Sequence, residues 1–246
     1  MKDSLIIKVG TSTLLGAHEL PSKSFDYIAS SIIALRATYN VVLVTSGAIG
    51  FGVTQLGLHV RSSDVSELQA LSMIGQVGLL RRWREAFDGE TIGQMLVTRH
   101  DLEHAESRQN FIRSISSIWG YGAIPIVNEN DAVSNDEISF GDNDQLAARV
   151  AVALGATRLV ILTDQDGIQA NFGTPLQARL STVSLQEVGN HIQLNASAQG
   201  KGGATSKVLA AEIALNSGIE VYVAHAASSQ AIERALSGNV GTKIVQ

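Results

Sequence analysis

Short runs of apolar residues recur along the chain, and each run ends in small or polar residues. Unbroken runs rich in Val, Ile and Leu are typical of parallel strands that helices cover on both faces. The six runs are SLIIKVG (4–10), NVVLVTSGAIG (40–50), TIGQMLVTRHD (91–101), AIPIVNEND (123–131), TRLVILTDQDG (157–167) and IEVYVAHA (219–226). They predict six strands in a mainly parallel sheet.

Helical patterns lie between these runs. One amphipathic stripe with helical spacing consists of Phe25, Ile28, Ile32 and Leu35. Asp64 with Glu67 predicts a capping box at the start of a helix, and Asp142 with Gln145 predicts another, in a helix that Gly155 ends. The strand–helix alternation predicts an α/β fold. Because no repeat, low-complexity tract or linker interrupts it, we expect residues 1–246 to form a single domain.

Composition narrows the class of protein. Of the 246 residues, 45% are hydrophobic and 17% charged, as in a water-soluble protein with a sizeable core. A net charge of -5 without a basic run argues against nucleic-acid binding. The absence of cysteine excludes disulfides, thiolate metal sites and cysteine nucleophiles. No apolar run is long enough to span a membrane, and the start MKDSLIIKVG is no signal peptide, so we expect a cytoplasmic protein.

Polar residues follow four of the predicted strands. In open α/β sheets, ligands bind beyond the carboxyl ends of the strands, so these residues are candidates for a site. The four segments cover residues 8–12, 45–48, 128–131 and 163–167. Lys8 stands out because a lysine in an apolar strand is costly unless it meets an anion. The alternatives are that Lys8 reaches solvent at the strand end or pairs with an acid.

The stretch GKGGATSK (200–207) resembles a phosphate-binding loop. It is no Walker A motif, because Asn195 stands where that motif needs its first glycine. Good helix formers follow from Val208 to Asn216, so we expect the loop to open a helix with Lys207 in its first turn. A cation there suits a helix only if an anion neutralises it. The alternative is a flexible loop with a solvated lysine.

Three further features each allow a structural interpretation and a functional one. Asp142 can act as a helix N-cap, which leaves Asp144 as a surplus carboxylate able to hold two lysines or to bind Mg²⁺ through water. His100 and His104 have the spacing of metal ligands but lack an HExxH pattern, so we expect a solvated helix face. Gly75 and Gly78 interrupt an apolar helical pattern, which predicts close helix packing, within the chain or between subunits.

Together these segments resemble the amino acid kinase family, over nearly the whole chain. The most specific blocks are VTSGAI (44–49), NENDAV (128–133), GDND (141–144), LTDQ (162–165) and GGATSK (202–207). The beginning KVGTS (8–12) is similar to the glutamate-phosphorylating branch, whereas kinases of acetylglutamate, aspartate or carbamate tend to begin with Lys-x-Gly-Gly. The resemblance implies a three-layer αβα sandwich and transfer of the ATP γ-phosphoryl group to the glutamate side chain, the first step of proline synthesis.

The resemblance also implies residue roles. The catalytic set would be Lys8, Asp144 and Lys207. The glutamate contacts would be Ser46, Gly47, Ala48, Asn128, Asp131 and Asn143. The nucleotide contacts would be Lys8, Thr163, Asp164, Lys201, Gly202, Gly203, Ala204, Thr205, Ser206 and Lys207. No protein ligand for a metal is implied, and ATP would enter with Mg²⁺.

The reaction fits the residues without that analogy. A glutamate carboxylate, with a pKa of about 4.3, is already an anion near neutrality and needs no general base. Two lysines around the γ-phosphate, with Mg²⁺, would neutralise the charge that spreads during transfer. An acid such as Asp131 in the acceptor pocket suits a free amino group and not an N-acetylated one.

The resemblance has departures and alternatives. The chain ends near the close of the kinase domain, so we expect no PUA domain; residues 170–175 replace the usual Asp-Pro on the adenine side, and Lys201 replaces a common Thr. We expect a homo-oligomer, a dimer or tetramer, with proline as a feedback inhibitor. The alternatives are a kinase of another small acid or phosphate in the same superfamily, a non-catalytic nucleotide-binding regulator, or a P-loop enzyme, which the spacing disfavours.

Overall fold

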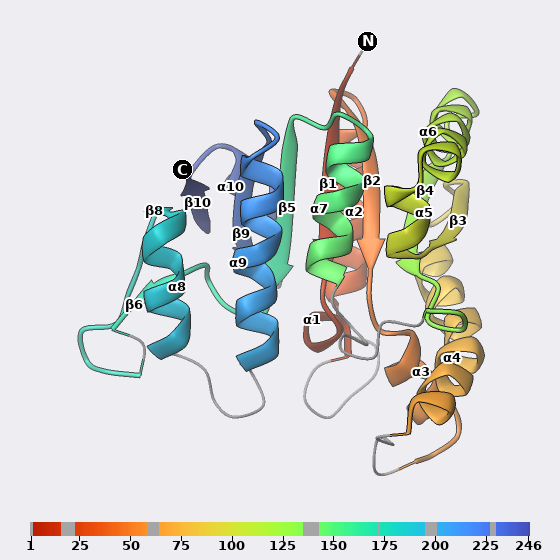
Figure 1. Cartoon of the computed structure of the whole chain (residues 1–246), viewed down its shortest axis with the longest axis horizontal. Helices are drawn as coiled ribbons and strands as arrows, with labels where there is room; N and C mark the ends of the chain where they lie inside the picture. The colour runs from red at the N-terminus through yellow and green to blue at the C-terminus, as the bar shows by residue number, and fades with distance from the viewer. Residues whose placement is uncertain are drawn as a thin grey trace.

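An eight-stranded sheet forms the centre of the molecule in the computed structural model (Figure 1), which describes residues 2–15, 23–58, 64–134, 143–171, 173–194, 201–226 and 230–246. Its strands are β1 (Asp3–Val9), β2 (Tyr39–Thr45), β3 (Ile92–Val97), β4 (Ile124–Glu129), β5 (Arg158–Thr163), β8 (Thr182–Ser184), β9 (Glu220–His225) and β10 (Thr242–Val245). A separate two-stranded sheet pairs β6 (Gln169–Ala170) with β7 (Ala178–Arg179).

The strand order is β3-β4-β2-β1-β5-β9-β10-β8. The first six strands pair in parallel, and they are the six that the apolar runs predicted. β10 is antiparallel to β9 and parallel to β8. The sequence pattern missed β6, β7, β8 and β10 because two to four residues are too few to show a periodicity. The prediction of a mainly parallel sheet is confirmed.

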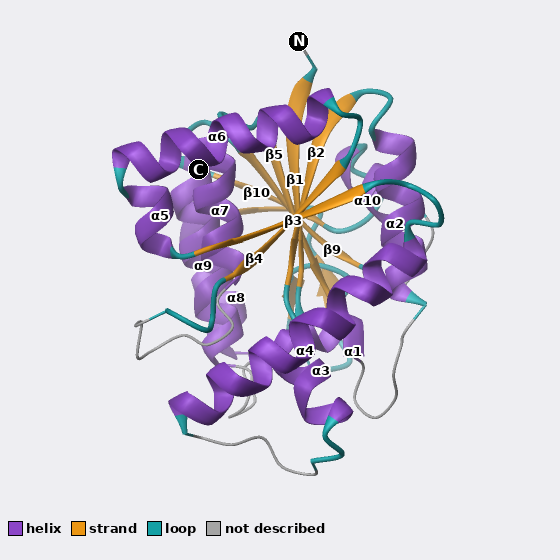
Figure 2. Ribbon diagram, turned by 90° about the vertical axis from the view of Figure 1, so that its right-hand side faces the viewer, coloured by secondary structure: helices purple, strands orange, loops and turns teal. Residues whose placement is uncertain are grey.

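Helices cover both faces of the sheet (Figures 1 and 2). One layer contains α5 (Arg99–Glu103), α6 (Ala105–Gly120), α7 (Asn143–Ala153), α8 (Leu185–Leu194) and α9 (Lys201–Leu215). The other contains α1 (Thr11–Leu15), α2 (Ser24–Leu35), α3 (Ala48–Gln55), α4 (Val65–Ala86) and α10 (Ala231–Leu236). Each layer of helices packs on one face of the sheet and forms a hydrophobic core there. Side chains alternate between the two faces along β1, so Ile6 packs in the first core and Leu5 and Ile7 pack in the second. The predicted three-layer αβα sandwich is therefore confirmed.

The predicted helices are present, with small differences at their ends. All four apolar positions of the stripe in α2 are buried. The Asp64 side chain accepts a hydrogen bond from the Glu67 backbone N–H at 3.1 Å, as an N-cap of α4 should. α7 begins at Asn143, and the predicted cap Asp142 lies outside the described residues. Gly155 follows α7 with φ +58°, a conformation that favours glycine at a helix end.

The two glycines of α4 mark a close helix crossing inside the chain. A Cβ on Gly75 would overlap the carbonyl oxygen of Ala48 and the backbone nitrogen of Gly52, both in α3. A Cβ on Gly52 would in turn overlap the carbonyl oxygen of Leu71 in α4. The backbones of α3 and α4 can approach this closely only because neither position carries a side chain. The predicted close packing thus occurs between α4 and α3.

The parallel strands β1, β2 and β5 end at one edge of the sheet, and α7 and α9 begin at that same edge (Figure 1). Figure 2 shows the strands fanning about the centre of the sheet, as the right-handed twist of strands requires. The carboxyl ends of these strands and the amino ends of these helices therefore lie at the same edge of the sheet. No helix in the described part of the chain is long and apolar enough to cross a membrane.

Candidate active site

Two lysines from opposite ends of the chain bind one carboxylate at this edge. Lys8 Nζ lies 2.5 Å from Asp144 Oδ1, and Lys207 Nζ lies 2.9 Å from Asp144 Oδ2. Lys8 comes from the central strand β1, Asp144 from the first turn of α7, and Lys207 from α9. The structure therefore brings together the three residues predicted to be catalytic. It also selects one alternative for Lys8, which pairs with an acid while it remains buried.

The electrostatics of this group favour an anion beside it. Asp144 is buried to 3% exposure, and burial alone would raise the pKa of its carboxyl group. The ammonium groups of Lys8 and Lys207 outweigh that effect and hold the pKa of Asp144 below its usual value. The three side chains carry two positive charges and one negative charge in a largely desolvated place. Ammonium groups placed in this way suit the binding of a phosphate group.

The helix after the glycine-rich stretch begins earlier than the sequence predicted. α9 begins at Lys201, so residues 202–207 are helical and Lys207 lies in the second turn instead of the first. Glycine costs a helix only about 1 kcal/mol per residue, and packing of α9 along α7 and α8 offsets that cost. From the second turn of α9, the Lys207 side chain reaches Asp144 in α7.

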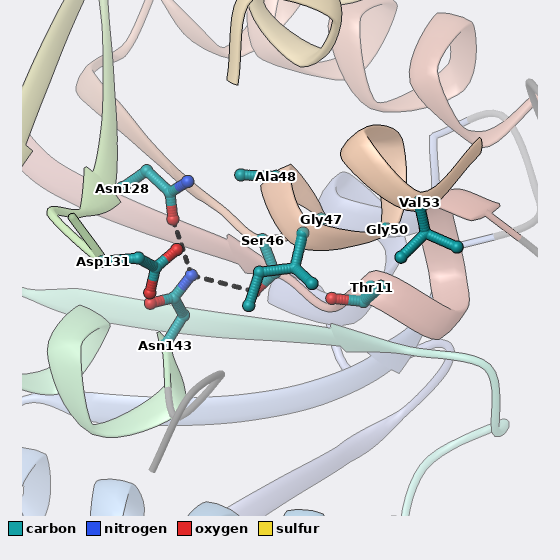
Figure 3. A pocket seen from close by; sticks show the side chains of 10 residues that line it. Thr11, Ser46, Gly47, Ala48, Gly50, Val53, Asn128, Asp131 and Asn143 are labelled. Atoms are coloured by element: carbon teal, nitrogen blue, oxygen red, sulfur yellow. Dashed lines mark hydrogen bonds between the residues drawn. The ribbon is translucent and has the colours of Figure 1, made fainter. Parts of the chain in front are cut away.

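A cavity of about 220 Å³, shown in Figure 3, reaches Asn143, which precedes Asp144 in the first turn of α7. It is lined by Thr11, Ser46, Gly47, Ala48, Ile49, Gly50, Val53, Asn128, Asp131 and Asn143. All six residues predicted to contact the acceptor are among them. They come from the ends of β2 and β4 and the starts of α3 and α7. Thr11, Ile49, Gly50 and Val53 were not predicted as lining residues.

Asn143 connects the two strand ends under this cavity. Its Nδ2 donates to the Thr45 carbonyl oxygen at 2.6 Å, to Ser46 Oγ at 2.9 Å and to Asn128 Oδ1 at 2.8 Å, the last two drawn in Figure 3. Its Oδ1 is buried and has no hydrogen-bond partner among the described residues. A buried acceptor without a donor is costly. The cavity beside it therefore suits a ligand that carries N–H groups.

The start of α3 forms the opposite wall. Its N-cap, Gly47, has φ +111°, a conformation that other residues rarely adopt. The first residues of α3, Ala48 and Ile49, line the cavity, and the first backbone N–H groups of a helix have no partner within that helix. Helix N-termini favour negative charge, so this wall suits a carboxylate of the ligand.

Sequence reasoning missed a set of residues behind the cavity. Ser72 Oγ donates to Asp131 Oδ2 at 2.7 Å, and Gln76 Oε1 accepts from Asn128 Nδ2 at 2.8 Å. Trp83 Nε1 donates to Thr45 Oγ1 at 2.9 Å. The three supporting side chains all come from α4. The only signal for them in the sequence was the pair of glycines that lets α4 pack closely.

The residues predicted to contact nucleotide are only partly described. Thr163 ends β5, and its hydroxyl donates to the exposed Asp164 carboxylate at 3.1 Å. Thr205 is exposed and Ser206 is buried, both in the second turn of α9. The backbone of residues 201–204 forms the first turn of α9, and their side chains, like Gly200, lie outside the described part of the structure.

The two histidines with metal-like spacing lie on the short helix α5 and just after it. Their rings stack with centroids 5.6 Å apart. Thr98 is the N-cap of α5, and Asp101 completes a capping box, since its carboxylate accepts from the Thr98 backbone N–H at 2.7 Å and from the Thr98 hydroxyl at 2.8 Å. Among the described residues, no group of three or more His, Cys, Asp or Glu side chains is placed to hold a metal ion.

Known proteins are similar to this chain in sequence. The model of the amino acid kinase family matches residues 3–225. The glutamate 5-kinase of Nocardia farcinica is 36% identical over 247 residues, covering 97% of this chain and 66% of the relative. That of Clostridium acetobutylicum is 36% identical over 252 residues, covering 98% of this chain and 94% of the relative. The chain thus spans slightly less than two thirds of the Nocardia protein.

Solved structures show the same arrangement of elements. The carbamate kinase of Giardia lamblia bound to AMP-PNP superposes with a TM-score of 0.69, over 99% of this chain and 98% of that one. Its sequence is 16% identical. At that identity the likeness concerns the fold alone.

Proposed function

The chain belongs to the amino acid kinase family, and from that premise we propose that it transfers the γ-phosphoryl group of ATP to the side-chain carboxylate of glutamate. The observation that carries the proposal is the Lys8–Asp144–Lys207 group and the cavity next to it, which has an acid on one side and a helix N-terminus on the other, as the two charged groups of an amino acid require. Relatives named glutamate 5-kinase that align over nearly the whole chain support it. In this proposal the whole chain acts as one catalytic domain.

The two lysines stabilise the transferring phosphoryl group. An oxygen of the glutamate side chain attacks the γ-phosphorus, the bond to the ADP oxygen breaks, and an acyl phosphate forms. Charge develops on the oxygens of the transferring group and on the leaving oxygen. Lys8 and Lys207 neutralise it, and Asp144 fixes both ammonium groups before the nucleotide arrives. Such preorganisation removes the cost of orienting charges during the reaction.

The acceptor cavity orients the substrate through its two charged ends. Asp131 and Asn143 Oδ1, which has no hydrogen-bond partner in the described part of the chain, accept hydrogen bonds from the α-ammonium group. Backbone N–H groups at Gly47 and Ala48, with the Ser46 hydroxyl, bind the α-carboxylate at the start of α3. Asn128 holds Asn143 in place. The side-chain carboxylate of glutamate then points toward Lys8 and the nucleotide.

The nucleotide lies along the neighbouring strand end and the start of α9. The first turn of α9 provides backbone N–H groups for the phosphates, Thr205 and Ser206 provide hydroxyls, and Thr163 and Asp164 contact the nucleoside part. Mg²⁺ enters with ATP and neutralises phosphate charge. It would be held mainly by the phosphates, because Asp144 already bridges two ammonium groups. Cytoplasmic location, self-association as a dimer or tetramer and feedback by proline belong to the same proposal.

Release of ADP from ATP and Mg²⁺, measured across a panel of amino acids, tests this function. Hydroxylamine in the assay should trap the acyl phosphate as a hydroxamate. We expect turnover with L-glutamate and none with N-acetylglutamate, since an acetyl group removes the ammonium charge that Asp131 binds. Turnover with aspartate, acetylglutamate or UMP in place of glutamate would indicate another kinase of the superfamily.

Lys207→Met is the matched variant for the mechanism. It keeps the length of the side chain and removes the charge, so we expect turnover to fall by about 10²–10³-fold. Lys243→Met is the control, because Lys243 pairs with Glu220 in β9, away from the cavity. A near-normal rate for Lys207→Met, or no hydroxamate with any amino acid, would refute the proposal.

A further inference from the structure

Two side chains on one face of helix α4 hydrogen-bond to residues that line the acceptor cavity. Ser72 and Gln76 are four residues apart and therefore lie one above the other on the helix surface. Ser72 donates to Asp131 Oδ2, and Gln76 accepts from Asn128 Nδ2. Neither side chain lines the cavity itself. Their partners do, and those partners are the carboxylate and the amide that face an acceptor.

The Ser72 hydroxyl restrains a charged group. Ser72 is 5% exposed and Asp131 is 9% exposed, so the 2.7 Å hydrogen bond between them is shielded from water. A hydrogen bond to an ionised, desolvated oxygen is stronger than one between neutral groups. An Asp side chain can turn about two bonds, and a donor fixed in a helix selects one orientation. Ser72 therefore restrains the position of the negatively charged Asp131 carboxylate.

Gln76 ends a directional chain of amides. The Thr45 carbonyl can only accept and the Glu129 backbone N–H can only donate, so Asn143 Nδ2 faces the former and Asn128 Oδ1 faces the latter. Asn128 Nδ2 must then point to α4, where Gln76 Oε1 accepts from it. This polarity leaves the Oδ1 of Asn143, a cavity-lining residue, as a buried acceptor for which the described residues supply no donor. The Gln76 amide thus supports the orientation of both asparagines.

Packing alone does not explain a glutamine at this place. Its Nε2 is buried and has no hydrogen-bond partner among the described residues. Leaving a donor in that state is costly, and a methionine of similar length would avoid the cost. What methionine lacks is the acceptor that binds Asn128. The glutamine therefore costs stability and contributes order in the acceptor site, a combination typical of functional positions.

We propose that Ser72 and Gln76 are positioning residues that hold Asp131 and the Asn128–Asn143 amide pair in the geometry that binds the amino acid acceptor. Gly75, between them, lets α4 lie against α3, whose first turn forms the other wall of the cavity. One helix thereby sets the spacing between the ammonium end and the carboxylate end of the acceptor site. The inference rests on the proposed function, in which these groups bind glutamate.

Ser72→Ala tests the first half. It removes one hydroxyl from a buried helix face and should raise the glutamate KM about tenfold, while kcat and the ATP KM stay within about twofold. Ser72→Cys, with a weaker donor of similar shape, should lie between the parent and Ser72→Ala. Ser31→Ala is the matched control, since Ser31 is equally buried but lies in α2; its kinetics should equal those of the parent.

A double-mutant cycle separates positioning from a general loss of packing. In the Asp131→Ala background, Ser72→Ala should add nothing to the glutamate KM, because the hydroxyl acts through that carboxylate. Gln76→Met acts through Asn128 and should raise the KM by a similar factor in both backgrounds. An effect of Ser72→Ala that persists without Asp131, or that falls equally on kcat and the ATP KM, would show a structural role and overturn the inference.

Titration calorimetry with glutamate and AMP-PNP gives a second measurement that does not depend on turnover. We expect the Kd of glutamate to follow the KM across the same variants. If the parent neither binds nor phosphorylates glutamate, the proposed function fails and this inference fails with it. If the parent does both, and the Kd and KM are the same in Ser72→Ala and Gln76→Met, only the inference is overturned.

Discussion

Asp144→Asn should destabilise the free protein and at the same time increase its response to nucleotide. The substitution keeps the shape of the side chain and removes the charge that holds two ammonium groups at 2.5 and 2.9 Å. Lys8 is nearly fully buried, so its charge in the core would lose the carboxylate that lies 2.5 Å from it. Breaking a buried pair in this way costs about 3–5 kcal/mol, and we take about 3 because the Lys207 side chain is 20% exposed.

Urea denaturation measures this loss directly. With an m-value of about 3 kcal/mol per molar, a loss of that size lowers the unfolding midpoint by about 1 M. Asp26→Asn is the control: Asp26 also pairs with an arginine, at 2.6 Å, but its side chain is 57% exposed, and exposed pairs contribute about 0–1 kcal/mol. AMP-PNP should raise the midpoint more in Asp144→Asn than in the parent, because its phosphates would neutralise both lysines.

Two results would refute this reasoning. One is an Asp144→Asn protein with the stability of the parent, which would mean that the lysines do not depend on the carboxylate. The other is a nucleotide effect confined to the parent, which would place the phosphates elsewhere. Turnover of Asp144→Asn should fall about 10²-fold, because the carboxylate no longer holds the two lysines in place before the reaction.

The pH dependence of stability gives an independent check. The pKa of Asp144 is lower in the folded protein than its ordinary value of 3.8, because the two ammonium groups outweigh the opposing effect of burial. Such a group contributes stability above the unfolded pKa, and this contribution is lost as the pH falls through the folded pKa. The parent should therefore lose stability below about pH 4 more steeply than Asp144→Asn does, as measured by thermal unfolding.

Three further predictions concern the acceptor side. Gly75→Ala should lower the free energy of unfolding by about 1–3 kcal/mol in urea denaturation and raise the glutamate KM, because its Cβ overlaps the backbone of α3. Gly78→Ala is the control: its Cβ would lie 3.2 Å from a phenylalanine ring, and it should change the free energy of unfolding by less than about 1 kcal/mol. Asp131→Ala should raise the glutamate KM and leave the ATP KM unchanged; the reverse would contradict the assignment. The Trp119→Phe variant keeps Trp83 as its single tryptophan. Trp83 donates a hydrogen bond to Thr45, the residue before Ser46, so glutamate binding should change its fluorescence; constant emission at saturating glutamate would contradict this expectation.

Much of the site could be predicted because each strand and the residues at its end are contiguous in the sequence. Apolar runs identify the parallel strands, and ligands bind where such strands end. That reasoning was enough to place Lys8, Ser46 and Asn128 at the edge where the cavity lies. The start of α9 was predicted several residues too late, because local preference counts glycines against a helix and cannot count the packing of α9 on α7.

The amino-acid pattern alone specifies the layered α/β fold and the edge of the sheet where a ligand binds, because both follow from local periodicity and backbone hydrogen bonding. The folded chain adds two facts that the pattern does not contain: Asp144 joins Lys8 to Lys207, and α4 supports the acceptor site through Ser72 and Gln76. Those contacts connect residues far apart in the chain. Their distances depend on how helices pack, as at Gly75, and no local pattern records that packing.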